Sequence, residues 1–76
     1  MKSFNDQLAE ILEVESLNSS DELIAFDSWD SLTILSIIAL IDENFGIALS
    51  GEEIENTGTV GGLLEHVKYL NKHQTV

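Results

Sequence analysis

Residues 31–46 read SLTILSIIALIDENFG, and their apolar spacing predicts the clearest helix of the chain. Successive residues of an α-helix are rotated by about 100°, so one stripe collects Ile34, Ile37, Ile38, Ile41 and Phe45. We expect this stripe to face the core. Gly46 should end the helix, because glycine readily adopts the left-handed conformation that is common just beyond helix C-termini.

The opposite side of this helix is also largely apolar. It carries Leu32, Leu35, Ser36, Ala39, Leu40 and Glu43. A helix that is apolar on both sides is either deeply buried or in contact with another molecule. Because a chain of this length cannot cover a helix on every side, we expect this second side to be a contact surface.

Working outward, the spacing of apolar residues predicts further helices before and after this one. The first begins at Ser3, whose hydroxyl can cap it, and fades after Val14. A short helix follows the cap residue Ser50, and a last helix follows Thr59. Residues 16–30 predict a long but ordered loop, because large apolar side chains interrupt its turn-forming residues.

Together these segments predict an all-α fold with a single domain over residues 1–76. It would be a small four-helix bundle with three longer helices, one short third helix and a long first loop. Gly61 and Gly62 stand in the first turn of the last helix. Each should cost about 1 kcal/mol relative to alanine, so we expect the segment 58–62 to open readily.

The charge of the chain restricts its partners. The 76 residues include 14 acids and 3 lysines, which gives a formal net charge of −11, and there is no cysteine. All of the acids fall between residues 3 and 67, where no Lys or Arg occurs. Such a protein is repelled by nucleic acid and by anionic membranes. We therefore expect a partner that presents basic side chains.

No targeting or membrane-spanning segment is apparent. The longest apolar run, Ile37–Ile41, is far shorter than the roughly 20 residues of a membrane span. The N-terminus lacks the apolar stretch of a signal peptide. We expect a soluble, cytoplasmic monomer.

Enzyme and metal sites find little support in the sequence. His66 and His73 are the only histidines, and no Gly-x-Ser-x-Gly motif occurs. A calcium loop that begins at Asp27 would need glycine at its sixth position and glutamate at its twelfth. Those positions hold Leu32 and Ile38. We expect neither a catalytic residue nor a specific metal site.

The tripeptide Asp30-Ser31-Leu32 lies where the ordered loop becomes the central helix. In the simplest interpretation it is only a helix cap. A serine hydroxyl at a helix N-terminus is exposed, however, and the backbone N–H groups and helix dipole there favour an attached phosphate.

Residues 26–47, FDSWDSLTILSIIALIDENFGI, resemble the core of an acyl carrier protein. The resemblance extends over nearly the whole chain, through the acidic third helix and the Thr59-Val60 start of the last one. It implies a carrier with no catalytic activity of its own. Ser31 would accept 4′-phosphopantetheine from coenzyme A, added by a separate phosphopantetheinyl transferase. The thiol of that arm would hold acyl groups as thioesters.

The resemblance also implies roles for other residues. Asp30 and Leu32 would flank the site and help the transferase to dock. Acyl-loading, ketosynthase-type or acyltransferase-type enzymes of fatty-acid, polyketide or specialised lipid synthesis would contact the remaining partner-recognition residues, Leu35, Ser36, Ala39, Asp42 and Glu43. A sequestered acyl chain would be bounded by Ile34, Ile37, Ile38, Ile41 and Phe45.

Two positions depart from typical fatty-acid carriers, in which the second and fifth residues after the modified serine are usually acidic. Here they are Thr33 and Ser36, which suggests a specialised carrier with more apolar partner contacts. A carrier of amino acids, as in D-alanine or nonribosomal peptide pathways, is the main alternative, although peptidyl carriers are less acidic. An unmodified acidic interaction module is the third interpretation.

Overall fold

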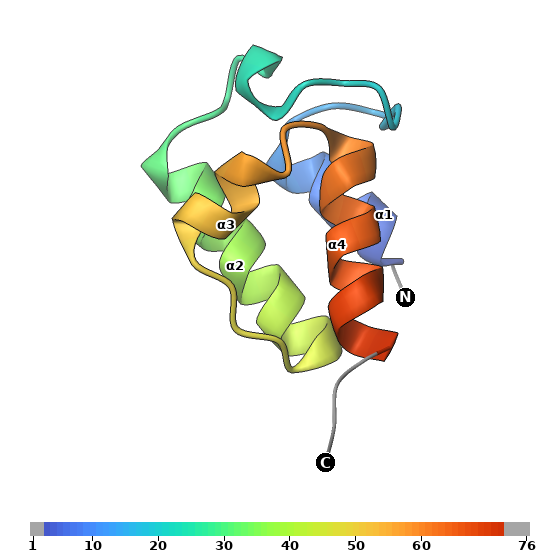
Figure 1. Cartoon of the computed structure of the whole chain (residues 1–76). Helices are drawn as coiled ribbons and strands as arrows, with labels where there is room; N and C mark the ends of the chain where they lie inside the picture. Colours follow the sequence, from blue (N-terminus) through green and yellow to red (C-terminus); the bar gives the residue numbers. More distant parts are fainter. Residues whose placement is uncertain (1–2, 73–76) are drawn as a thin grey trace.

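The structure, a computed structural model, describes residues 3–72 and confirms an all-α bundle (Figure 1). Its elements are α1 (Phe4–Ile11), the 3-10 turn η1 (Leu23–Ala25), α2 (Ser31–Phe45), α3 (Gly51–Asn56) and α4 (Val60–Lys72). Over this range there is no strand, only an isolated bridge between Glu22 and Thr59. The radius of gyration of 11.6 Å is that of a compact domain. Among the described residues, no helix is long and apolar enough to cross a membrane.

Helix α1 begins as its sequence predicts. The Ser3 hydroxyl accepts a hydrogen bond from the backbone N–H of Asp6 at 3.1 Å. The helix ends at Ile11, three residues before the predicted end at Val14. Glu13 then adopts a positive φ of 60°, which turns the chain into the long loop.

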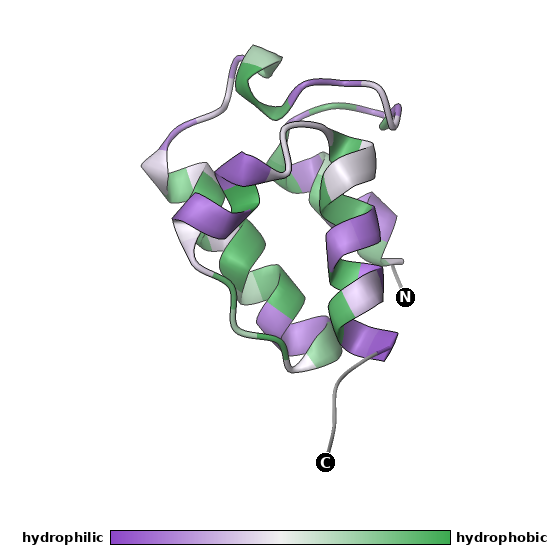
Figure 2. Cartoon of the chain, in the orientation of Figure 1, coloured by the Kyte–Doolittle hydropathy of each residue, from purple (hydrophilic) through white to green (hydrophobic). Residues whose placement is uncertain are grey.

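Helix α2 follows its predicted bounds, and Gly46 ends it with a φ of 66°. Apolar residues occupy most of its length, and acids gather at its C-terminal end (Figure 2). Its last turn packs against the first turn of α1, where the rings of Phe4 and Phe45 meet edge to face with centroids 5.1 Å apart.

The buried side of α2 extends beyond the predicted stripe on one side. Ile37 and Ile41 have no exposed surface, whereas Ile34, Ile38 and Phe45 are only partly buried. Two residues outside the predicted stripe, Thr33 and Leu40, are buried instead. The prediction that Leu40 lies on the exposed side was therefore wrong. Both the α1 side and the α3–α4 side of α2 are covered, so its buried arc is wider than one stripe.

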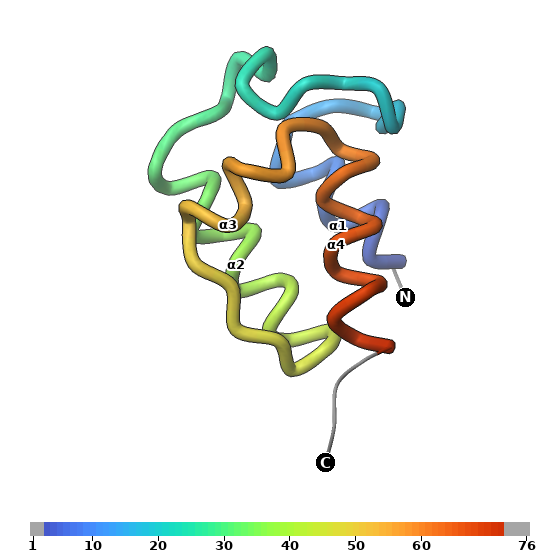
Figure 3. Tube along the Cα trace, in the orientation of Figure 1, coloured from blue at the N-terminus to red at the C-terminus, as the bar shows by residue number. Residues whose placement is uncertain are grey.

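The long first loop is ordered and passes over the end of the bundle at which α4 begins (Figure 3). Leu23 is fully buried, although its neighbour Ile24 is 75% exposed. Backbone hydrogen bonds join the loop to the start of α4: Leu23 N–H to Gly58 O, Val60 N–H to Asp21 O, and Gly61 N–H to Ser19 O, at 2.8–3.0 Å.

These bonds argue against the expectation that segment 58–62 opens readily. The two helices that flank the segment are also capped as predicted. The Ser50 hydroxyl and the Glu53 side chain form a reciprocal capping box at α3. The Thr59 hydroxyl accepts from the N–H of Gly62 at 3.0 Å at the start of α4.

Candidate functional site

Asp30 is the cap residue of α2. Its backbone is extended, and its carboxylate accepts the backbone N–H of Thr33 at 2.8 Å. This hydrogen bond is the main reason why the pKa of Asp30 lies below its ordinary value, and the Thr33 side chain and the Leu32 N–H act in the same direction. Partial desolvation opposes them. Asp30 therefore stays ionised in neutral solution and holds the first turn of α2 in place.

Ser31 is the first residue of α2 and is exposed. Within residues 3–72, its hydroxyl has no hydrogen-bond partner. An acceptor or anion attached there lies at the positive end of the helix dipole. The hydroxyl is thus accessible to an enzyme and suited to carry a phosphodiester.

Thr33 is buried, with 8% of its surface exposed, and its side chain reaches back to the loop. Its Oγ1 donates a hydrogen bond to the backbone carbonyl of Ser28 at 2.5 Å. The Ser28 hydroxyl in turn donates to the carbonyl of Leu12 at 3.1 Å. Thr33 therefore does not belong to the exposed face of α2, and its departure from the acidic residue of typical fatty-acid carriers does not make that face more apolar.

This network was missed from the sequence. Asp30 and Thr33 are three residues apart, which is the spacing of a helix cap and the N–H group that it accepts, so this hydrogen bond could be predicted from the sequence. The bond from Ser28 to Leu12 spans sixteen residues, and no local pattern indicates it.

An apolar strip runs along α2 from Ser31. It consists of the four exposed residues Leu32, Leu35, Ser36 and Ala39. Leu32 is 74% exposed and Leu35 is 60% exposed. The acids Asp42 and Glu43 continue this strip toward the end of the helix, and both are exposed. Every residue assigned to partner contact by resemblance is thus accessible, and all but Asp30 lie within α2.

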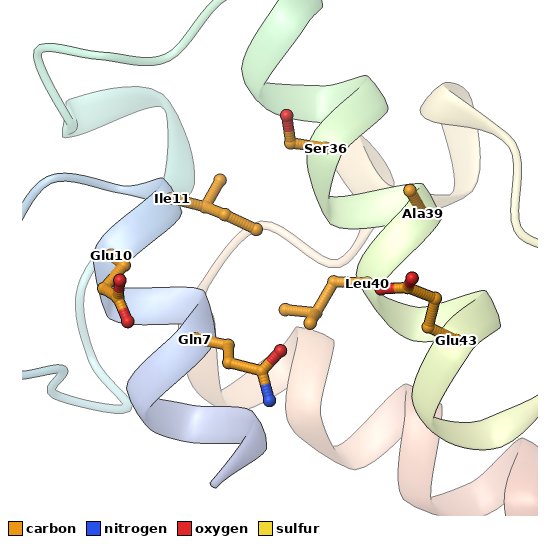
Figure 4. A pocket seen from close by; sticks show the side chains of 7 residues that line it. All are labelled: Gln7, Glu10, Ile11, Ser36, Ala39, Leu40 and Glu43. Carbon is orange, nitrogen blue, oxygen red and sulfur yellow. The ribbon is translucent and has the colours of Figure 1, made fainter. Parts of the chain in front are cut away.

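A shallow groove borders this strip between α1 and α2 (Figure 4). Its lining residues are Gln7, Glu10, Ile11, Ser36, Ala39, Leu40 and Glu43. Leu40 and Ile11 extend into the space between the two helices, which explains why Leu40 is buried rather than part of the strip.

The described residues hold no cluster of three or more potential metal ligands. His66 is half-buried, and its Nε2 lies 3.8 Å from a carboxylate oxygen of Glu53. His73 lies outside the described residues.

Comparison with protein families identifies the type of site. The family model for phosphopantetheine attachment sites matches residues 5–67, which include the whole of α2. Searches of curated proteins and of solved structures gave no significant match. Domains of the matched family carry the site at which 4′-phosphopantetheine is covalently attached. The exposed serine at the start of α2 is compatible with that chemistry. The chain belongs to the family of phosphopantetheine-carrying carrier domains.

Proposed function

We propose that this protein is an acyl carrier protein in which Ser31 carries the phosphopantetheine arm. The observation that supports Ser31 most strongly is its position. It is exposed, follows the cap residue Asp30 directly, and has a hydroxyl with no partner among residues 3–72. Other serines in this region differ: Ser28 donates to Leu12, and Ser36 lies on the second turn of α2, away from the helix terminus.

The attachment reaction requires little from the carrier. The Ser31 oxygen bonds to the phosphorus that bears pantetheine, and the bond from this phosphorus to the nucleotide half of coenzyme A breaks. That half leaves, and the serine proton passes to a base of the transferase. The carrier presents the hydroxyl, and its helix N-terminus stabilises the new phosphodiester. The proposed carrier has no catalytic role of its own.

The surface of α2 suggests how partner enzymes bind. The strip Leu32, Leu35, Ser36 and Ala39 is uncharged, whereas Asp42 and Glu43 are acidic and exposed. A matching enzyme would place apolar side chains opposite the strip and Lys or Arg opposite the acids. Since Thr33 is buried, Ser36 is the one departure from typical fatty-acid carriers that changes the exposed face.

We further propose that the cargo is an acyl group of a specialised pathway and that the protein acts as a cytoplasmic monomer. The net charge of −11 opposes self-association, and it favours acyl over peptidyl cargo because peptidyl carriers are less acidic. If the strip is adapted to apolar partners, Ser36→Glu should improve loading by a fatty-acid-synthase acyltransferase. The same change should not improve turnover by the native partner, and a large gain there would contradict the specialised role.

Intact-mass measurement tests the attachment directly. The protein is incubated with coenzyme A and a broad-specificity phosphopantetheinyl transferase. We expect one phosphopantetheine adduct on the wild type and on Ser20→Ala, which removes an exposed loop hydroxyl. Ser31→Ala should gain none. An adduct on Ser31→Ala, or none on the wild type under conditions that modify a known carrier, would refute the proposal.

A further inference from the structure

Thr33 uses both of its polar donors to hold the entrance to α2. Its backbone N–H donates to the Asp30 carboxylate at 2.8 Å, and its hydroxyl donates to the Ser28 carbonyl at 2.5 Å. The Ser28 hydroxyl continues the connection to the Leu12 carbonyl at the end of α1. Through Ser28, whose carbonyl accepts one hydrogen bond and whose hydroxyl donates the other, the end of α1 is therefore connected to the first turn of α2.

Ser31 lies, in the sequence, between Ser28 and Thr33, which the hydrogen bond from Thr33 Oγ1 to the Ser28 carbonyl holds together. Nothing within the described chain holds its hydroxyl directly. The position of Ser31 Oγ therefore depends on how the backbone of residues 28–33 is held. Trp29 packs partly against the core before Ser31, and after Ser31 the buried Thr33 anchors this backbone from inside the protein, whereas Asp30, Ser31 and Leu32 are exposed.

We infer that Thr33 is a positioning residue for the modification of Ser31, an inference that rests on the proposed attachment at that serine. Its hydroxyl, acting through the Ser28 carbonyl, keeps the loop and α2 in the one arrangement that presents Ser31 Oγ to the transferase. Thr33 touches none of the reacting atoms. The position that is acidic in typical fatty-acid carriers thus serves presentation of the serine here, instead of contact with a partner.

Loss of the Thr33 hydroxyl should raise the KM of the transferase for this carrier. Without the Thr33 hydroxyl, the turn can adopt other arrangements, and the transferase binds only the fraction that is competent. One neutral hydrogen bond changes such an equilibrium by about 2- to 10-fold. Once the complex has formed, Ser31 is held by the transferase, so kcat should stay close to that of the wild type.

Steady-state kinetics with coenzyme A, a broad-specificity transferase and varied carrier concentration test this inference. Thr33→Val removes the donor and keeps the shape. We expect its KM to rise about 2- to 10-fold with kcat little changed. Thr33→Ser keeps the donor and should restore the KM of the wild type.

A matched control separates positioning from stability. Val67→Ala destabilises the fold in a different way, by removing buried volume in α4, outside the hydrogen-bond chain. At a temperature where circular dichroism shows each variant folded, Val67→Ala should keep the KM of the wild type. Equal changes in KM for Val67→Ala and Thr33→Val would overturn the inference, as would an unchanged KM for Thr33→Val.

A second variant covers the case in which Thr33→Val does not fold. Ser28→Ala removes the hydrogen bond from the Ser28 hydroxyl to the Leu12 carbonyl, so it should also raise KM. A KM equal to that of the wild type would overturn the inference. Failure of the proposed function is distinguishable from either result. It would appear as no modification of the wild type, or as modification that survives in Ser31→Ala.

Discussion

Replacing Gly61 with alanine tests the contact between the long loop and α4. From helix propensity alone, Gly61→Ala should stabilise the protein by about 1 kcal/mol. The structure reverses this expectation. An alanine Cβ at this position would lie 2.8 Å from the Ser19 carbonyl oxygen and 2.9 Å from the Ser19 Cβ. The Gly61 N–H also donates to that same oxygen at 2.8 Å.

The size of the effect follows from these contacts. Ser19 must move away, which costs about 1–3 kcal/mol for overpacking. The hydrogen bond to Gly61 would be lost, at about 1 kcal/mol. The propensity gain of about 1 kcal/mol offsets part of this. The net destabilisation should be about 1–3 kcal/mol, and each kcal/mol lowers the Tm of a domain of this size by about 4–8 °C.

Thermal and urea unfolding followed by circular dichroism provide the assay. Gly51→Ala is the matched control, because its Cβ would lie 3.3 Å from only the Cγ2 atom of Ile34, a side chain that can shift. We expect its stability to stay within about 0.5 kcal/mol of the wild type. Gly62→Ala should destabilise the protein more than Gly61→Ala, since its Cβ would clash with the Thr57 carbonyl oxygen of the backbone. A Gly61→Ala protein as stable as the wild type would refute this account of the loop contact.

Further predictions concern the core, the cap and the charge. In urea unfolding, Leu40→Ala should lower the free energy of unfolding by about 2–5 kcal/mol, and Leu35→Ala should lower it by less than about 0.5 kcal/mol. Equal losses for the two variants would contradict the observed burial of Leu40 and exposure of Leu35. The pKa of Asp30 in the folded protein lies below its ordinary value of 3.8. Its ionised carboxylate therefore stabilises the fold fully at a pH above 3.8, and this contribution is lost as the pH falls through the folded-state pKa. Asp30→Ala should thus be less stable than the wild type at neutral pH, by a margin that shrinks in acid; a constant margin would argue against this cap. Raising NaCl from about 0.01 M to about 0.1 M shortens the Debye length from about 30 Å to about 10 Å. The Tm should then rise because repulsion among the 14 acids is screened, and an unchanged Tm would show that this repulsion is unimportant.

Local signals predicted most of the fold. The caps Ser3, Asp30, Ser50 and Thr59 all bond to the first turns of their helices, and Gly46 ends α2 in the left-handed conformation. Such features depend on residues three or four positions apart, so a sequence displays them directly. The packing of Leu40 against α1 was not predictable in this way, because a helical wheel shows which residues share a side but not how many neighbours cover it.

In the candidate site, too, local features could be predicted from the sequence and tertiary contacts could not. The exposed Ser31 and its apolar strip follow from residue types and helical spacing. The roles of Thr33 and Gly61 depend on partners in the long loop, Ser28 and Ser19, whose backbone positions are set by tertiary packing. From the sequence, Thr33 was therefore interpreted only as a departure from typical fatty-acid carriers, and Gly61 only as a residue that weakens its helix.

Peptide mapping of the modified protein tests the central claim most directly. Cleavage after glutamate releases residues 23–43, a peptide that contains Ser28, Ser31, Thr33 and Ser36. Tandem mass spectrometry of this peptide can assign the modified residue. The account predicts phosphopantetheine on Ser31 alone, and its presence on any other residue of the chain would contradict it.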